Sequence, residues 1–589
     1  MYNMIHHLNS VHPVKNVSGD TITRVVRWQL AQFGVLSLIF VIRNSHRLAC
    51  PPLRFWRGVF VADYPDEKRI ESEETFISFN RHGISFEHFN YSINFSMESV
   101  TPKRQMIYLN VILVYLFILM GVGIYKSRKI HTQTDFAVAG RKLTPWILVG
   151  TMLATWIGTG SVLGNAGKTY ETGMAALILP IGGTLGILIL TRIAGKVRAF
   201  EKFTVPEIIG ERYGQTARML SVIALVLAYM VIVSYQYNAG GAVLETILTD
   251  AKGNVLISAE MATIFAAAFI ILYTLLAGLV SVAYTDVGNG IIMTISLLIA
   301  FPILWIKAGG FGGMEAAFAE MGKPDHMKFW GVYSGMDIIN FCLPPFLLVL
   351  GDANMYQRFS ASKDAKGATS ATIVLVFVVL IIELLIISSA WVSSSMIADA
   401  ANGRHVLIYA SRQFLPTLLG AIMMTTIIGI IISTADSYLL VPATTLMRDV
   451  YLNYINPEAS EKKIVFLSRV VVLILGLVAY AVSKGFAEST GFFEKALYAY
   501  TIYGASITPA LIAAFFWKGA TKEGAVASIL SGTVVTLLWK EAPFVRTLLP
   551  ASLYHNLDEV LPAISASVFA LIVVSLFTGR SKRGSDLSP

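Results

Sequence analysis

The sequence predicts an all-α polytopic membrane protein, and three observations support this fold class. The 589-residue chain is 55% hydrophobic and only 14% charged, with a mean hydropathy of +0.63, far from the composition of a soluble globular protein. Its apolar residues come in runs of about 20, which is the length of a helix that crosses a bilayer and about twice that of a barrel strand. Small basic clusters separate these runs, as in the loops of helical membrane proteins.

The first 105 residues differ from the rest of the chain. Charges are dense there, and the apolar run at residues 30–42 is too short to span a membrane comfortably. We interpret residues 1–105 as an atypical leader upstream of a native start at Met106. A signal-like segment and an extracellular domain are the alternatives.

Apolar runs of roughly 18 to 25 residues with few charges predict about thirteen transmembrane helices. Residues 106–143 would hold the first helix and a cytoplasmic loop, residues 144–517 the core of the protein, and residues 518–589 two trailing helices and a short tail. The predicted helices begin near Ile107, Trp146, Ala175, Leu220, Ser258, Ile291, Ile338, Ala371, Leu415, Ile464, Phe492, Val526 and Pro562.

Basic residues follow the first, third and seventh of these runs, in residues 126–142, 192–218 and 358–366. The positive-inside rule places those loops, and the basic C-terminus, in the cytoplasm. This topology also explains the net charge of +9 without a nucleic-acid partner. Residues 309–335 and 397–412 are then outer loops. Cys50 and Cys342 lie far apart and imply neither a disulfide nor a thiolate metal site.

A polar cluster interrupts the apolar run that begins near Leu415. Ser433, Asp436 and Ser437 stand at i, i+3 and i+4 and therefore share a helix face, with Thr434 beside them. Hydroxyl and carboxylate oxygens are the ligands of a hard cation. The alternative is that the hydroxyls bond to carbonyls four residues earlier or to a neighbouring helix, but the added carboxylate favours a cation site.

Two other apolar runs are interrupted by Gly or Pro. Residues 150–173 contain several glycines, whose alternative explanation is close helix packing; a break there would free carbonyls of residues such as Ala154 and Ile157 to hold a cation. Residues 344–358 place Asp352 and Asn354 where hydrocarbon is expected. Interrupted helices five spans apart are typical of an inverted repeat with a central site.

Two further carboxylates remain open at this point. Asp286 lies near the cytoplasmic end of a predicted helix, where a solvated loop carboxylate and a functional group are equally good interpretations. Glu383 lies in the middle of a predicted helix, as an interior polar group of unknown role.

Several motifs together resemble the sodium:solute symporter family, which includes bacterial carriers for galactose, proline, pantothenate and sialic acid. The resemblance covers residues 106–578. The motifs are "AGRKL" at Ala139, "LAGLVSVAYTD" from Leu276, "QRF" at Gln357, "STADS" followed by "RDVY", "SR" at Ser468 and "FFWKGATKEGAVASILSG" from Phe515.

The resemblance implies two inverted five-helix repeats with broken first helices, the LeuT-like fold, and uptake of a small polar organic solute driven by sodium through alternating access. It implies a shared sodium site and, in some members, a second cation site. Flanking aromatic side chains and the second interrupted helix would hold the solute. The shared sodium site would use Ala154, Ile157, Ile430, Ser433 and Thr434, the second cation site Asp286, Asp436 and Ser437, and the solute site Trp156, Asp352, Asn354, Tyr500 and Tyr503.

Departures from the family pattern bear on the solute and the coupling ion. Asp352 replaces an amide of the sugar carriers and a neutral group of the proline carriers, while Trp156 stands where proline carriers are acidic. Asp436 replaces a small hydroxyl or apolar residue, so the ion stoichiometry is open. Asp352 could pair with an amine of the solute.

There are three alternatives to a sodium symporter. A proton-coupled carrier and a transporter-like sensor are compatible with the sequence. An intramembrane aspartyl protease would use Asp352 and Asp436 as a dyad, but Val349 breaks the protease motif and the spans are too many. The expectation is therefore a plasma-membrane (inner-membrane) carrier and not an enzyme, with sodium as coupling ion, no cofactor or other metal, and no obligate protein partner.

Overall fold

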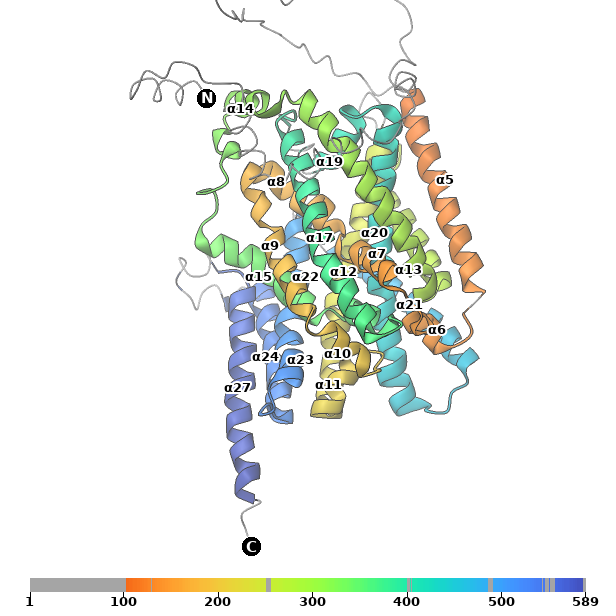
Figure 1. The fold of residues 1–589 in the computed structure, drawn as a ribbon, viewed down its shortest axis with the longest axis vertical. Helices are drawn as coiled ribbons and strands as arrows, with labels where there is room; N and C mark the ends of the chain where they lie inside the picture. Colours follow the sequence, from red (N-terminus) through yellow and green to blue (C-terminus); the bar gives the residue numbers. More distant parts are fainter. Residues whose placement is uncertain are drawn as a thin grey trace, which may run out of the picture. The chain divides into compact units, whose positions relative to one another are not determined.

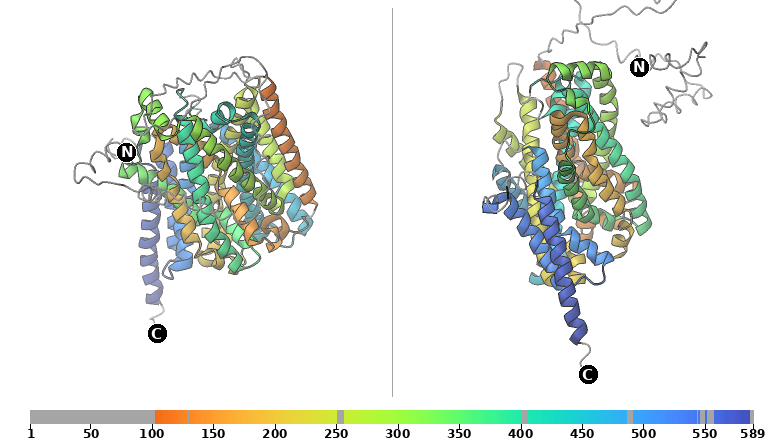
Figure 2. Two further views of the ribbon diagram at one scale, coloured as in Figure 1. Left: turned by 45° about the horizontal axis from the view of Figure 1, so that its top comes forward. Right: turned by 90° about the vertical axis from the view of Figure 1, so that its left-hand side faces the viewer.

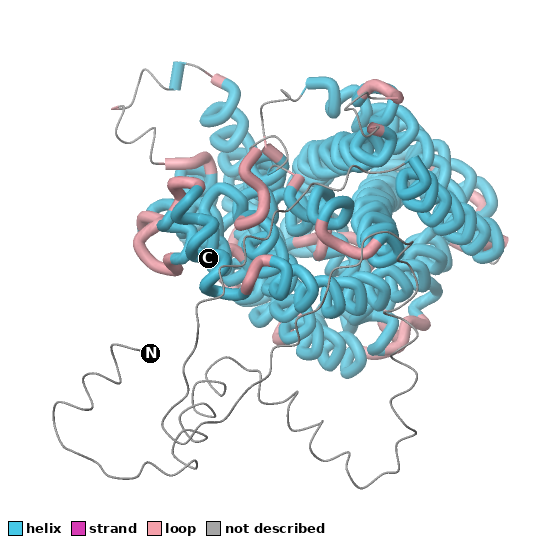
Figure 3. Tube along the Cα trace, turned by 90° about the horizontal axis from the view of Figure 1, so that it is seen from above, coloured by secondary structure: helices cyan, strands magenta, loops and turns pink. Residues whose placement is uncertain are grey.

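The computed structural model describes residues 102–128, 130–249, 256–399, 403, 405–485, 491–542, 544–545, 550 and 557–585. The chain divides into two units, Met1–Asn94 and Phe95–Pro589. The leader predicted at residues 1–105 therefore lies outside the described residues up to position 101. In the described part of the second unit, helices account for nearly all of the chain (Figure 1, Figure 3), and two residues, Leu143 and Ser362, form an isolated β-bridge.

The first half of the described chain contains α5 (Pro102–Ser127), α6 (Gln133–Val138), η2 (Ala139–Arg141), α7 (Pro145–Trp156), η3 (Gly160–Asn165), α8 (Ala166–Thr172), η4 (Gly173–Ile178), α9 (Pro180–Leu190), α10 (Ala194–Ala199), α11 (Val205–Tyr213), α12 (Gln215–Leu248), α13 (Ala259–Lys307), α14 (Gly310–Glu320) and η5 (Pro324–Met327). The second half contains α15 (Gly335–Gly351), α16 (Ala353–Ala361), α17 (Ala365–Ser394), α19 (Val406–Gln413), α20 (Thr417–Thr445), η6 (Leu446–Ile455), α21 (Glu461–Gly485), α22 (Phe492–Ser506), α23 (Thr508–Phe516), α24 (Lys522–Glu541) and α27 (Val560–Ser585).

Every one of the predicted transmembrane starts falls in a helix of the described chain or within two residues before one. By length and apolar composition, nine of the described helices can cross a membrane, or ten if the bent pair Pro145–Trp156 and Gly160–Ile178 is one span. The difference from about thirteen arises in three places. The 49-residue α13 holds two predicted spans, α9 has only 11 residues, and α24 falls outside the nine. The total of thirteen stays a prediction.

Both interrupted helices predicted from the sequence are broken in the structure. Ile157 leaves the helical conformation with ψ 93°, and the chain bends by 51° between α7 and the following helix. Asp352 separates α15 from α16 with φ −57° and ψ 111°. These breaks give each half of the core a discontinuous first helix, as in transporters with inverted repeats.

A third break divides α13 at Gly278. Its φ of 55° and ψ of 170° are open to glycine and strained for other residues. A Cβ at this position would lie 2.7 Å from Ile130 Cδ1 and 3.1 Å from Phe136 Cδ2. The glycine of "LAGLVSVAYTD" therefore lets two spans of α13 change direction while α6 packs closely against the turn.

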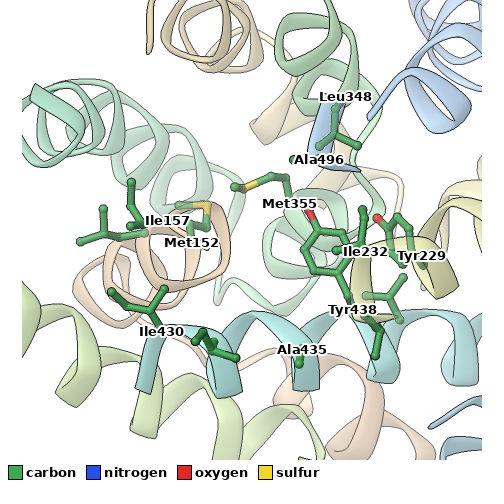
Figure 4. Close-up of a cluster of buried hydrophobic side chains, with 14 of the residues drawn as sticks. Met152, Ile157, Tyr229, Ile232, Leu348, Met355, Ile430, Ala435, Tyr438 and Ala496 are labelled. Carbon is green, nitrogen blue, oxygen red and sulfur yellow. The ribbon is translucent and has the colours of Figure 1, made fainter. Parts of the chain in front are cut away.

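Helix α20 is the central helix of the bundle. Its most apolar window is 83% buried, whereas that of α5 at the edge is 22% buried. It packs against α12, α13, α5 and α7, and Figure 4 shows Ile430, Ala435 and Tyr438 on it facing Met152, Ile157 and Met355. Helices α24 and α27 lie side by side (Figure 2). The polar cluster of α20 thus faces protein, not lipid.

The two outer segments predicted as loops each contain a helix. Residues 309–335 hold α14 and the short η5, and residues 397–412 include most of α19. Met314 and Phe318 of α14 are buried, as are Val406 and Leu407 of α19. The loop prediction was therefore wrong for these stretches, because apolar residues at helical spacing lie among the glycines and charges.

Candidate ion and solute sites

Two hydroxyls of α20 meet the broken end of α7. Ser433 Oγ lies 3.4 Å from the carbonyl oxygen of Ala154, and Thr434 Oγ1 lies 3.5 Å from the same atom. Gly158 permits this approach, because a Cβ there would lie 3.0 Å from the Thr434 side chain. Ile157 and Ile430 are buried beside these groups (Figure 4). The structure thus brings the residues predicted for the shared sodium site to one place.

Asp286 joins this cluster from α13. It is completely buried and accepts a 2.6 Å hydrogen bond from Thr151 Oγ1 on Oδ2 and a short one from Ser433 Oγ on Oδ1. The interpretation of Asp286 as a solvated loop carboxylate was therefore wrong. Helix α13 continues through this position, since its break lies eight residues earlier, at Gly278.

Arg358 supplies a positive charge that the sequence analysis assigned to a cytoplasmic loop. That placement was wrong: Arg358 lies in α16 and is fully buried. Its Nη2 donates to Ser437 Oγ at 2.6 Å and lies 3.9 Å from Asp286 Oδ2. A buried guanidinium needs such partners, because an unpaired charge is costly to remove from water.

Asp436 and Ser437 complete the cluster. Ser437 Oγ donates to Asp436 Oδ1 at 3.3 Å and lies 3.5 Å from Thr155 Oγ1. Oδ2 of Asp436 is buried without a hydrogen-bond partner among the described residues. With both carboxylates ionised, Asp286, Asp436 and Arg358 sum to one negative charge. The cluster therefore offers oxygen ligands and a net attraction for a monovalent cation.

Asp352 is enclosed by tyrosines at the other break. Tyr229 Oη donates to its Oδ1 at 2.5 Å, and Tyr438 Oη lies 3.5 Å from its Oδ2. The backbone N–H of Asn354 donates to Oδ1 at 3.1 Å, so the carboxylate also caps α16. Tyr503 Oη donates to the carbonyl of Gly351 at 2.8 Å, and its ring stacks on Tyr229. Tyrosine hydroxyls and a backbone N–H thus fix the position of the Asp352 carboxylate.

A small cavity of about 40 Å³ lies near the break of α7. Two of the three aromatic residues of the predicted solute site, Trp156 and Tyr500, line it together with Glu383 of α17. Asp352, Asn354 and Tyr503 are not among its lining residues. The lining consists of Trp156, Gly160, Ser161, Asn165, Leu179, Pro180, Gly183, Phe341, Pro345, Glu383, Phe493, Ala496, Leu497 and Tyr500.

A larger vestibule of about 1020 Å³ lies toward the end of the bundle that the predicted topology places outside. It is lined by η3, α8, the C-terminal half of α12, the start of α13, the end of α21 and the start of α22. Phe493 borders both this vestibule and the small cavity, and its ring meets Phe341 edge-on at 5.3 Å. Phe493 is therefore a side chain that the two spaces share.

Sequence reasoning missed several residues of these sites. Thr151, Tyr229 and Tyr438 carried no signal, because single hydroxyls in apolar helices are common and pair with carbonyls. Arg358 carried one: it follows Asp352 and Asn354 in the same interrupted helix, so its charge could have been assigned to the interior. Glu383 was noticed, but its neighbours come from distant parts of the chain.

Comparison with known proteins agrees with this geometry. Residues 136–532 match the model of the sodium:solute symporter family. The osmoregulated proline transporter OpuE of Bacillus subtilis is 24% identical over 489 residues, covering 80% of this chain and 95% of the relative. The sodium/proline symporter of Haemophilus influenzae is 23% identical over 497 residues, covering 80% and 94%.

Among solved structures, the substrate-bound, outward-open state of a sodium-coupled sialic acid symporter resembles this chain. The TM-score is 0.65 at 18% sequence identity, and the alignment covers 80% of this chain and 97% of the other. At this identity the likeness shows a shared fold. All of the predicted cation and solute residues lie within the part of the chain that the family model matches.

Proposed function

Because the chain belongs to the sodium:solute symporter family, we propose that it carries a small polar organic solute into the cell with sodium as the coupling ion. It is an integral membrane transporter that works by alternating access, with the two repeats rearranging around a central site. The plasma membrane, with the C-terminus in the cytoplasm, is the proposed location. A membrane potential adds about 2.3 kcal/mol per charge per 100 mV to such transport.

The observation that supports this proposal best is the meeting of α20 with the break of α7. Ser433 and Thr434 direct their hydroxyls at the Ala154 carbonyl from 3.4 and 3.5 Å. We assign the coupling sodium to these three groups, with the carbonyls of Ile157 and Ile430 completing its shell. Sodium without its water needs oxygen ligands of this kind.

Asp286, Asp436 and Ser437 form the proposed second cation site. The cluster holds one net negative charge when both carboxylates are ionised, so one monovalent cation neutralises it. Sodium bound at Ser433 lies next to Asp286, which already bonds to that hydroxyl. The two predicted sites thus share a carboxylate, which supports one sodium at a time in this region.

The proposed solute region comprises Trp156 and Tyr500 on the cavity and Asp352, Asn354 and Tyr503 at the break before α16. Relatives carry proline by name, and the structural neighbour carries sialic acid. This chain has Trp156 and Asp352 where the proline carriers are expected to have other residues, so its solute is proposed only as a small polar organic compound.

Sodium titration of the purified full chain tests the proposal without knowledge of the solute. Wild type should gain thermal stability with sodium, but not with potassium, in proportion to the logarithm of ion concentration over its dissociation constant. The double variant Ser433→Ala/Thr434→Ala should lose this shift. The matched control Ser370→Ala/Thr369→Ala on α17, whose hydroxyls bond within their own helix, should keep it.

The same titration addresses the ion count. Asp436→Asn should leave a sodium shift with the wild-type slope if one sodium binds, and should reduce the slope if Asp436 holds a second one. A shift that depends on pH and not on sodium would contradict the proposal and favour the proton-coupled alternative. The family assignment removes the aspartyl protease alternative, because the family and the relatives are transporters.

A further inference from the structure

Glu383 is a buried carboxylate without a cationic partner among the described ion pairs. It lies in the transmembrane helix α17 and is 3% exposed. Its described hydrogen-bond partners are neutral: Ser161 Oγ donates to Oε1 at 2.5 Å, and Asn165 Nδ2 donates to Oε2 at 3.3 Å. Both come from η3, directly after the break of α7.

Two other buried carboxylates of this protein lie close to an arginine. Asp449 bonds to Arg218 at 2.5 Å, and Asp286 lies 3.9 Å from Arg358. Ionisable groups at membrane depth are rare and are commonly paired or functional. An ionised Glu383 with one hydroxyl and one amide as its described hydrogen-bond donors therefore has no cationic group among the described ion pairs to balance its charge.

The surroundings of Glu383 suit a cation that comes from solution. The carboxylate lines the small cavity together with the aromatic side chains of Trp156, Tyr500, Phe341 and Phe493. Aromatic faces attract a cationic nitrogen, most strongly where water is excluded. A carboxylate with aromatic walls is the combination that recognises ammonium and quaternary ammonium groups.

Lys168, which lies near two of these aromatic rings, is outside this cavity. Lys168 Nζ sits over the rings of Phe341 and Phe493, 5.5 and 5.8 Å from their centroids, and pairs with Glu171 at 2.9 Å. It lines the vestibule and not the cavity. Lys168 is therefore already paired with a carboxylate other than Glu383.

Asp352 is a weaker candidate for the same role. Its Oδ1 already accepts hydrogen bonds from Tyr229 and from the backbone of Asn354, and it caps α16. It does not line the cavity. Using it to bind a solute would require breaking the cap and the tyrosine contact.

We propose that Glu383 binds a positively charged nitrogen of the solute, so that the carrier takes organic cations or zwitterions in preference to neutral compounds. This inference rests on the proposed solute transport and names its substrate class. Ser161 and Asn165 hold the carboxylate in place, and the aromatic walls surround the bound nitrogen. Ala154 precedes the break of α7 and η3 follows it, so sodium binding at Ala154 and solute binding at Glu383 act on the two sides of the same break.

The test uses purified full chain at saturating sodium, with thermal stability as the readout. Four nitrogen probes are each matched to a compound of similar shape without the positive charge. The pairs are ethanolamine and ethylene glycol, L-proline and tetrahydrofuran-2-carboxylate, choline and 3,3-dimethylbutan-1-ol, and guanidinoacetate and N-carbamoylglycine. At least one charged member should stabilise wild type while its uncharged match does not.

For that probe, Glu383→Gln should weaken the apparent affinity about 30-fold or more, the cost of removing one partner of a buried charge pair. The sodium shift should remain. Glu383→Asp keeps the charge and should lose less affinity than Glu383→Gln. Glu320→Gln, an equal change of charge on the exposed end of α14, should keep both responses.

The outcomes separate this inference from the proposed function. Absence of the sodium shift in wild type would defeat sodium coupling itself. A sodium shift with no response to any charged probe, or an equal response to an uncharged match, would overturn the inference alone. So would unchanged probe affinity in Glu383→Gln, or loss of the sodium shift in that variant, which would make Glu383 a sodium ligand. If Glu383→Gln does not fold, the wild-type pairs and Glu383→Asp still decide.

Discussion

Asp286 is the residue at which the two predicted cation sets meet. It was assigned to the second set, yet its carboxylate bonds to Ser433 of the first and to Thr151 of α7. It also faces Arg358 at 3.9 Å. One side chain therefore links α7, α13, α16 and α20 at the centre of the protein.

We expect Asp286→Asn to abolish the sodium shift and to lower stability by about 3 kcal/mol or more, because it leaves Arg358 buried without its nearest carboxylate. Thermal unfolding of the purified protein with and without sodium measures both effects. The control is Asp325→Asn, which breaks an ion pair to Lys328 whose side chains are 67% and 66% exposed. Its effect should be small. A similar loss in both variants would contradict the central role of Asp286.

At the residue scale, the sequence predicted which residues could supply oxygen ligands better than it predicted which residues contact one another. Ser433 and Thr434 stood out because their spacing and Asp436 are local features. Arg358 did not, because its partners Asp286 and Ser437 lie 72 and 79 positions away and only the fold brings them together. A charge near the end of an apolar run gives the same local pattern in a loop and in the interior.

At the scale of elements, the breaks in helices could be predicted and short outer helices could not. Gly and Pro within apolar runs marked the interruptions at Ile157 and Asp352, because these residues weaken or block helical hydrogen bonding. Helix α14 begins among glycines and was predicted as a loop. Its burial of Met314 and Phe318 supplies the stability that local propensity lacks.

The break within α13 gives a matched pair of substitutions. Gly278→Ala should destabilise the protein by about 1 to 2 kcal/mol, because alanine is strained at φ 55° and its Cβ would press on Ile130 and Phe136. Gly288→Ala lies on the same helix, has no atom within 4 Å of the new Cβ, and should be neutral or stabilising by up to about 1 kcal/mol. Thermal unfolding of the two variants compares them directly. Equal destabilisation by Gly278→Ala and Gly288→Ala would show that the helix break does not require glycine at position 278.

The short η5 carries a titratable contact outside the membrane-spanning segments. Burial, with Lys323 nearby, lowers the pKa of His326 below its ordinary value of 6.5. The His326 carbonyl accepts a hydrogen bond from Trp391 Nε1 at 2.9 Å, and its ring lies 5.1 Å from that of Phe318. This outer segment is thus tied to α17 through the backbone of His326, while the imidazole packs against Phe318 of α14.

Acid should loosen that segment. The unfolded chain protonates His326 near pH 6.5 while the folded chain resists, so stability present above that pH is lost as the pH falls toward the lower folded pKa. Thermal stability measured at pH 7.5 and 5.5 should therefore fall less in His326→Gln than in wild type. An identical decrease in both would assign the acid sensitivity to other groups.

At the scale of the whole molecule, membrane orientation follows from loop charge and can be tested by labelling. In a background with Cys50→Ser and Cys342→Ser, Ala242→Cys at the vestibule should react with an impermeant maleimide in intact cells. Glu523→Cys, exposed at the start of α24, should react only after permeabilisation. The reverse pattern would show that the positive-inside assignment is inverted.

The fold as a whole could be predicted because the length and hydropathy of apolar runs identify membrane helices, and the family motifs indicated how these helices are arranged. The sequence did not predict that the small cavity and the vestibule share a lining residue. Phe493 opens α22 with an ordinary aromatic pair, "FF", and nothing local indicates that one ring borders two spaces. Such a role depends on side chains from four or more helices meeting at one depth.

That shared ring has a consequence for the rates of transport. A solute that moves between the vestibule and the cavity, in either direction, passes the Phe493 ring that borders both. The ring therefore adds the same barrier to arrival and departure, slowing both without changing their ratio. A slower return to the vestibule gives the rearrangement of the two repeats more time to occur before the solute escapes.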